Sequence, residues 1–160
     1  MAILSRPEAV YGDALIRPGE EDVVLDLLAE AAAWLRARGI EQWPRRFPAD
    51  SVGGALLVEQ AGLPIATLAV ADEDSALWGP DAAPAYYVSR LAVTRHGTGL
   101  GRRLLDWVAA KAAEHGKQYV RVATASDNPA LRRYYERAGF THVADPPHAR
   151  WPTSLYERSS

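Results

Sequence analysis

Apolar residues near the start of the chain recur at spacings of three and four, which is the spacing of one helical face. They run over residues 24–35 and are preceded by the acidic residues Glu20 and Glu21. Acidic side chains favour a helix amino terminus, and Gly39 is well placed to end the helix. We therefore expect an amphipathic helix that ends at about residue 38 and covers a sheet.

Strand-like and helical patterns alternate along the rest of the chain. Short apolar runs bounded by turn residues predict strands at residues 14–17, 55–60, 64–71, 85–93, 119–124, 140–144 and 151–157. A second helix is expected over residues 99–116, and a third begins at Asn128 and Pro129 and ends before Gly139. Residues 40–54 contain two prolines and two glycines, which favours an ordered loop with a short helix.

The order of these elements predicts the fold class. Strand 85–93, helix 99–116 and strand 119–124 make a β-α-β unit, which requires parallel pairing of its two strands. The earlier strands are joined by a hairpin turn at Ala61 and Gly62 and should pair antiparallel. We expect an α/β (α+β) fold in one domain over residues 1–160, with a mixed sheet and a loose tail over about residues 1–12.

Composition and charge narrow the classes of partner. The 18 basic and 20 acidic side chains give a net charge of -2, so no overall field favours nucleic acid or an anionic membrane. Cysteine is absent, which excludes disulfides and thiolate metal sites, and the four histidines show no metal-binding spacing. With neither a signal peptide pattern nor a long apolar run, we expect a cytoplasmic protein without a metal.

The segment TRHGTGLGRRLL contains three alternating glycines directly before the second expected helix. Glycines at such a turn let several backbone N–H groups point at one place, and the helix dipole favours an anion there. Flanking arginines strengthen the expectation of a phosphate or pyrophosphate ligand. The dinucleotide fingerprint is broken by Arg102, and no P-loop motif occurs.

Two motifs together resemble the GNAT superfamily of acyl-CoA-dependent N-acyltransferases. The first is an L-x-V strand end followed by a G-x-G-x-G helix start, and the second is N-x(6)-Y-E-x-x-G-F over residues 128–140. The resemblance implies that acyl-CoA is bound by residues of both motifs and by their neighbours: Leu91, Ala92, Val93, Arg95, His96, Gly97, Thr98, Gly99, Leu100, Gly101, Arg102, Asn128 and Tyr135. His96 departs from the Arg or Gln usual at its position.

The resemblance also implies a reaction, in which an amine attacks the acetyl-CoA thioester directly. Tyr135 falls on the family's general-acid position, and a phenol with a pKa of about 10 is protonated near neutral pH. The acceptor cleft is expected to be bordered by four aromatic residues: Trp34, Trp43, Trp78 and Tyr87. No residue is identified as the general base.

Other functions remain open from the sequence. The same cofactor site would serve a non-catalytic acyl-CoA binding or sensing domain, and the glycine turn alone would also suit a different phosphate ligand. The acceptor is a small-molecule or peptide amine of unspecified identity, and a homodimer is neither required nor excluded.

Overall fold

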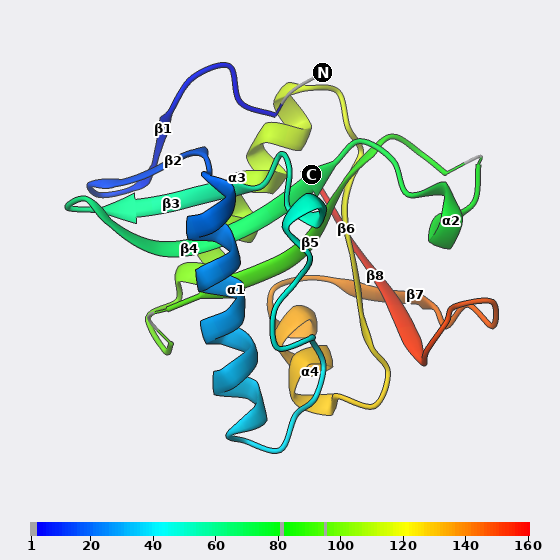
Figure 1. Cartoon of the computed structure of the whole chain (residues 1–160). Coiled ribbons are helices and arrows are strands. Elements are labelled where there is room, and N and C mark those ends of the chain that lie inside the picture. The colour runs from blue at the N-terminus through cyan, green and yellow to red at the C-terminus, as the bar shows by residue number, and fades with distance from the viewer. Residues whose placement is uncertain (1–2, 81, 95) are drawn as a thin grey trace. The chain divides into compact units, whose positions relative to one another are not determined.

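The computed structural model describes residues 3–80, 82–94 and 96–160. Its elements, in chain order, are β1 (Glu8–Tyr11), β2 (Ala14–Pro18), α1 (Glu21–Arg36), a 3-10 helix η1 (Ala49–Ser51), β3 (Leu56–Gln60), β4 (Leu63–Ala71), α2 (Ser75–Trp78), β5 (Ala85–Val93), α3 (Leu100–Glu114), β6 (Tyr119–Ala125), α4 (Pro129–Arg137), β7 (Thr141–Ala144) and β8 (Thr153–Ser159) (Figure 1). The strands are hydrogen bonded in the order β1-β2-β3-β4-β5-β6-β8-β7.

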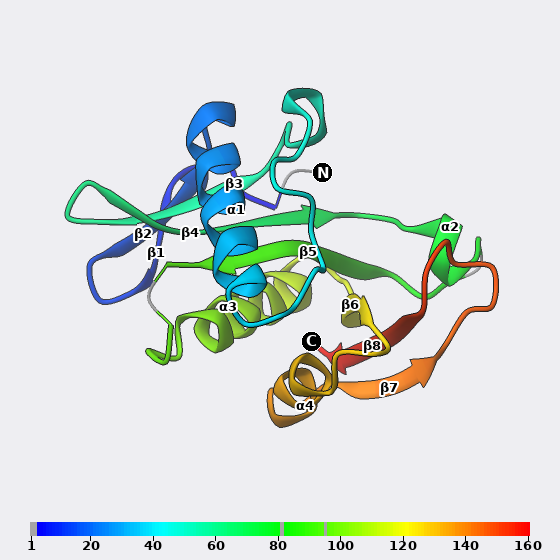
Figure 2. The same ribbon diagram turned by 60° about the horizontal axis from the view of Figure 1, so that its bottom comes forward.

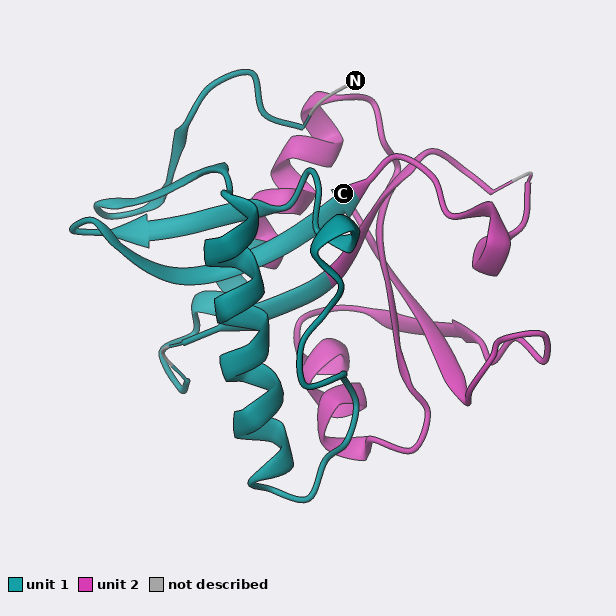
Figure 3. Ribbon diagram, viewed as in Figure 1, with its two compact units in different colours: residues 1–70, 90–104 teal, residues 71–89, 105–160 magenta. Residues whose placement is uncertain are grey.

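The chain divides into two compact units, which are described separately (Figure 3). Unit 1 consists of Met1–Val70 and Arg90–Leu104, and unit 2 of Ala71–Ser89 and Leu105–Ser160. β5 and α3 each begin in one unit and end in the other.

Unit 1 is an antiparallel arrangement of β1 to β4 with α1 against one face (Figure 2). The hairpin between β3 and β4 turns at Ala61 and Gly62, whose φ values of 53° and 78° suit a two-residue turn. The apolar face of α1 packs on residues of the following loop and of β5, forming one core cluster: Val24, Leu25, Leu28, Val52, Ala55 and Ala92. The periodicity of residues 24–35 therefore identified the buried face of α1 correctly.

Unit 2 contains the parallel pair of strands. β5 pairs with β6 from Ala85 opposite Tyr119 to Val88 opposite Val122, while β8 pairs antiparallel with both β6 and β7. α4 lies beside β6 and β7. Its amino terminus is capped by the Asn128 side-chain oxygen, which accepts a hydrogen bond from the Leu131 N–H at 3.2 Å.

The mixed sheet and the β-α-β unit are confirmed. A stretch expected to belong to a loose tail instead forms β1, which pairs antiparallel with β2 after a turn at Gly12 with φ 52°. Its side chains are exposed or half-buried, so the sequence carried no apolar alternation there. The four-residue helix α2 was not expected either, and it is capped locally by Asp74, whose side chain accepts from the Leu77 N–H at 3.4 Å.

Candidate active site

The glycine turn lies in unit 1, between the end of β5 and the start of α3. Gly97 and Gly99 have φ values of 77° and 78°, which side chains adopt only at a cost. The Gly99 carbonyl accepts the Arg103 N–H at 3.1 Å and so begins the hydrogen bonding of α3. The Thr94 N–H anchors the other end of the turn by donating to the Ile65 carbonyl at 2.9 Å. Backbone N–H groups at such a helix start favour a bound anion.

The third glycine has a different role from the first two. Gly101 is buried within the first turn of α3, where the backbone is helical, so no turn conformation requires it. Leu100 beside it is also buried, whereas Thr98 and Arg102 are exposed. Two of the three alternating glycines therefore shape the turn.

His96 is held against α1 through its ring. The His96 and Trp34 rings are stacked with centroids 4.0 Å apart and planes 10° apart, and the Arg38 guanidinium lies 3.7 Å from the centre of the Trp34 ring. Trp34, expected at the acceptor cleft, thus contacts the glycine turn. Arg95, expected to contact the cofactor, lies outside the described residues.

The strand segment before the turn presents two faces. Ala92 is buried and belongs to the α1 core cluster, while its neighbours Leu91 and Val93 are half-buried. Because successive strand residues alternate between faces, Leu91 and Val93 point away from that cluster. Their backbone leads directly into the glycine turn.

Tyr135 lies in unit 2, on the buried side of α4. Its side chain is 8% exposed. Its ring makes edge contacts with the rings of Tyr134 and Phe140, at centroid distances of 5.4 Å and 5.5 Å. Burial, with a smaller contribution from Tyr134, raises the pKa of the Tyr135 hydroxyl far above its usual range. Tyr135 is therefore neutral at physiological pH and holds its proton more tightly than an exposed tyrosine.

Trp78 and Tyr87, also in unit 2, belong to one cluster around Arg121. Their rings meet edge-on at 6.0 Å, and the Arg121 guanidinium lies 4.5 Å from the centre of the Trp78 ring. Arg121 donates to the Tyr87 hydroxyl at 3.0 Å and to the Glu157 carboxylate at 3.0 Å. The structure brings these two predicted acceptor residues together around a guanidinium that is already paired.

Trp43 is the remaining predicted acceptor residue. It meets Phe47 edge-on at 5.9 Å, and both rings pack against the core cluster of unit 1. The aromatic loop between α1 and β3 is thereby fixed on α1.

One feature in each unit had no sequence signal. Arg90, in the interior of β5, has a φ of 52°, and the Oγ1 of Thr124 in β6 is buried without a hydrogen-bond partner in the described part of the chain. A buried hydroxyl of this kind suits a polar ligand, because leaving it unpaired costs about 1–3 kcal/mol. The Thr124 hydroxyl lies in unit 2 and the glycine turn in unit 1. The turn by itself offers the backbone N–H groups that suit a phosphate-bearing cofactor.

Metal and membrane sites were sought over the same three described stretches. No three His, Asp or Glu side chains there are grouped so that they could hold a metal ion. No helix there is long and apolar enough to cross a membrane.

Comparison with known proteins places this architecture in a family. The model of the acetyltransferase (GNAT) family matches residues 24–140, which is well over half of the chain. The Bacillus subtilis protein named uncharacterized N-acetyltransferase YesJ is 31% identical over 148 residues, covering 82% of this chain and 78% of its own length.

Solved structures share the fold at lower identity. A GNAT family acetyltransferase from Listeria monocytogenes has a TM-score of 0.76 and 23% identity, over 92% of this chain and 95% of its own. The yncA structure from Salmonella typhimurium, solved with its cofactor acetyl-CoA, has a TM-score of 0.59 and 20% identity, over 92% and 94%. The chain belongs to the acetyltransferase (GNAT) family, whose members transfer an acetyl group from acetyl-CoA.

Proposed function

We propose that both units together form one N-acetyltransferase domain, which moves the acetyl group of acetyl-CoA to an amine by direct attack. The observation that carries the proposal is the pair of left-handed glycines, Gly97 and Gly99, directly before α3 within the segment that the family model matches. That backbone suits the pyrophosphate of coenzyme A, because free N–H groups and the helix dipole act on the same anion.

Cofactor binding is assigned to the segment from Leu91 to Arg102 and to Asn128. The backbone of Leu91 to Val93 offers a strand edge for the pantetheine amides, and residues 96–101 offer N–H groups to the phosphates. The Trp34–His96 stack supports the assignment, since it fastens the turn to α1 at a centroid distance of 4.0 Å. A turn fixed before binding loses less entropy when the anion arrives.

Tyr135 is proposed as the general acid for the departing thiolate of coenzyme A. Its buried phenol is neutral at physiological pH, so it can donate a hydrogen bond or a proton as negative charge develops on sulfur.

Tyr135→Phe tests the assignment because it removes the hydroxyl and keeps the ring contacts with Phe140. We expect kcat to fall about 10²- to 10⁴-fold, the usual contribution of general acid catalysis, with KM for acetyl-CoA changed less than about twofold. Tyr134→Phe on the same helix is the matched control and should retain kcat. Unchanged turnover in the Tyr135 variant would rule out the acid role.

A further inference from the structure

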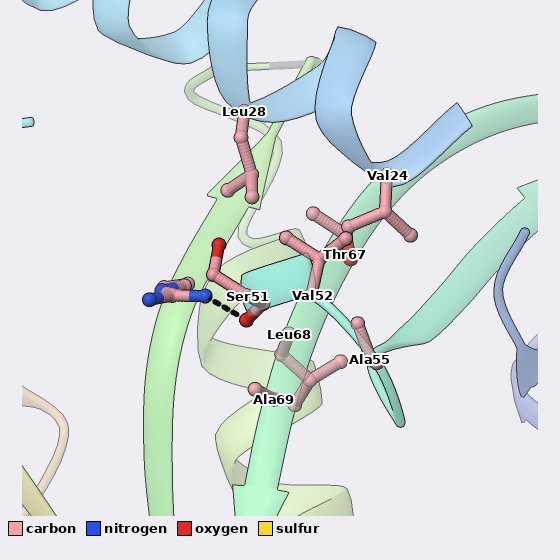
Figure 4. A pocket seen from close by; sticks show the side chains of 10 residues that line it. Val24, Leu28, Ser51, Val52, Ala55, Thr67, Leu68 and Ala69 are labelled. Atoms are coloured by element: carbon pink, nitrogen blue, oxygen red, sulfur yellow. Dashed lines mark hydrogen bonds between the residues drawn. The ribbon is translucent and has the colours of Figure 1, made fainter. Parts of the chain in front are cut away.

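The hollow beside Arg90 in unit 1 is part of the packed core. Its wall includes four residues of the core cluster: Val24, Leu28, Val52 and Ala55. Figure 4 shows these side chains around Ser51, whose carbonyl accepts a hydrogen bond from Arg90. Side chains packed in this way leave no room for a ligand. The polar contacts between β8 and α4 in unit 2 point to a further role.

Tyr156 in β8 joins two charged side chains of α4, and both elements belong to unit 2. The Tyr156 side chain is fully buried. Its hydroxyl donates to Glu136 Oε2 at 2.9 Å and accepts from Arg132 Nε at 3.0 Å. An arginine donor and a glutamate acceptor make both bonds charge-assisted, which strengthens them. We call these two hydrogen bonds the Tyr156 bridge.

The Tyr156 bridge fixes α4 in two ways. Arg132 and Glu136 are four residues apart, so they lie on one face of the helix, one turn apart. A single hydroxyl bonded to both opposes sliding of α4 along its axis and rotation about it. Arg132 Nη1 also donates to the Ser126 carbonyl at 3.4 Å, which ties the loop before α4 to the same side chain.

Tyr135 lies in the turn of α4 that the Tyr156 bridge holds. Its ring contacts are with Tyr134 and Phe140, which are close to it in the chain. Such local contacts orient the ring relative to α4, but they do not determine where α4 lies on the sheet. The Tyr156 bridge supplies that link, because β8 is a strand of the sheet. It also gives a role to Glu136, the glutamate of the motif N-x(6)-Y-E-x-x-G-F.

We infer that Tyr156 is a positioning residue: its hydroxyl fixes the turn of α4 that carries Tyr135 and thereby places the Tyr135 phenol for its reaction. This inference rests on the proposed role of Tyr135 as general acid. Proton donation requires the donor and acceptor atoms to come within about 2.6–3.2 Å. A displacement of about 1 Å can lower the rate by about 10²-fold. Tyr156 acts through Tyr135 and needs no contact with the substrate.

Ser154 offers a matched control on the same strand. It is buried, and it lies two residues before Tyr156, on the same face of β8. Its Oγ donates to Asp145 Oδ1 at 2.6 Å and lies 2.9 Å from Ser126 Oγ. These partners lie outside α4. Ser154→Ala therefore removes buried hydrogen bonds of β8 and leaves the Tyr156 bridge intact.

Tyr156→Phe tests the inference, because it removes the hydroxyl and keeps the buried ring. We expect kcat to fall about tenfold, with KM for acetyl-CoA changed less than about twofold, since the acid is displaced and the glycine turn is unaffected. Glu136→Gln, whose amide oxygen still accepts from Tyr156, should keep most of kcat, whereas Glu136→Ala should lose it as Tyr156→Phe does. Ser154→Ala should keep kcat within about twofold.

A double-mutant cycle separates positioning from a general loss of structure. If Tyr156 acts through the Tyr135 hydroxyl, adding Tyr156→Phe to Tyr135→Phe should lower kcat no further. Additive losses would overturn the inference, because Tyr156 would then act by another route. Unchanged kcat in Tyr156→Phe, or an equal loss in Ser154→Ala, would also overturn it.

A readout without turnover keeps this inference distinct from the proposed function. In protein labelled with 3-fluorotyrosine, the ¹⁹F NMR signal of Tyr135 is identified by its absence from Tyr135→Phe. Glu136→Ala breaks the Tyr156 bridge with every tyrosine in place, so it should shift or broaden that signal, and Ser154→Ala should not. If no amine is acetylated, the proposed function fails and this spectrum decides the positioning alone. A changed Tyr135 signal would support the Tyr156 bridge, and an unchanged one would refute it.

Discussion

Gly99→Ala isolates the contribution of the glycine turn to cofactor binding. Gly99 has a φ of 78°, and a Cβ added there would have no heavy atom within 4 Å. The substitution therefore causes no clash within the folded chain, and its cost comes from the left-handed backbone. That cost is about 1–2 kcal/mol for a residue other than glycine.

The chain can accept this strain or relieve it by rotating the peptide units on either side of residue 99. If the left-handed backbone is kept, the strain lowers the unfolding free energy by about 1–2 kcal/mol, which lowers the melting temperature by about 2–8 °C for a domain of this size. Rotation also turns the neighbouring N–H groups away from the proposed phosphate. Loss of one charge-assisted hydrogen bond, worth about 1.5–3 kcal/mol, would raise KM or Kd for acetyl-CoA at least about tenfold.

Gly116→Ala is the matched control. Gly116 has a φ of 73°, equally open space at its Cβ position, and a place beyond the other end of α3. Both variants should lose similar thermal stability, measured by differential scanning fluorimetry. Only Gly99→Ala should weaken the binding of acetyl-CoA, measured by calorimetry and by initial rates. Equal acetyl-CoA affinity in the two variants would refute the assignment of the turn as a phosphate site.

Three further predictions follow from particular contacts. Trp34→Leu removes the His96 stack, worth about 0.5–1.5 kcal/mol, so KM for acetyl-CoA should rise about two- to tenfold in initial-rate assays, while Trp34→Phe keeps most of the affinity. Asn128→Ala removes the α4 cap and should lower the unfolding free energy by about 1 kcal/mol in urea titrations; no loss would contradict the cap. Burial raises the pKa of Tyr135 in the folded state, so its neutral phenol contributes to the unfolding free energy. This contribution is complete below a pH of about 10 and is lost as the pH rises above that value. Wild type should therefore lose more unfolding free energy than Tyr135→Phe above that pH, and parallel curves would contradict the buried phenol.

The sequence predicted the elements that have strong local signals. The periodicity of residues 24–35 identified α1, Asn128 and Pro129 marked the start of α4, and Ala61-Gly62 marked a hairpin. These signals are local, so no tertiary information was needed. β1 was not predicted because its side chains are exposed or half-buried and show no alternation of apolar and polar residues. α2 was not predicted because four residues are too few to show a helical period.

Only part of the candidate site could be predicted from the sequence. Motif spacing singled out Gly97, Gly99 and Tyr135; the two glycines have left-handed backbones and Tyr135 is buried, and their roles stay predictions. The strain at Arg90 and the Trp34–His96 contact depend on how distant segments meet, and residue type alone does not encode them. The aromatic residues expected at the acceptor cleft accordingly divide among three separate surroundings.

The central claim is that this chain transfers acetyl groups to amines. Its most direct test is to incubate purified protein with acetyl-CoA and a panel of amino acids, aliphatic amines and peptides, following thiol release together with the mass of the acceptor. We predict acceptor-dependent thiol release with one N-acetyl group gained per thiol. Binding of coenzyme A without acceptor-dependent release from any member of the panel would contradict the claim and favour a sensing domain.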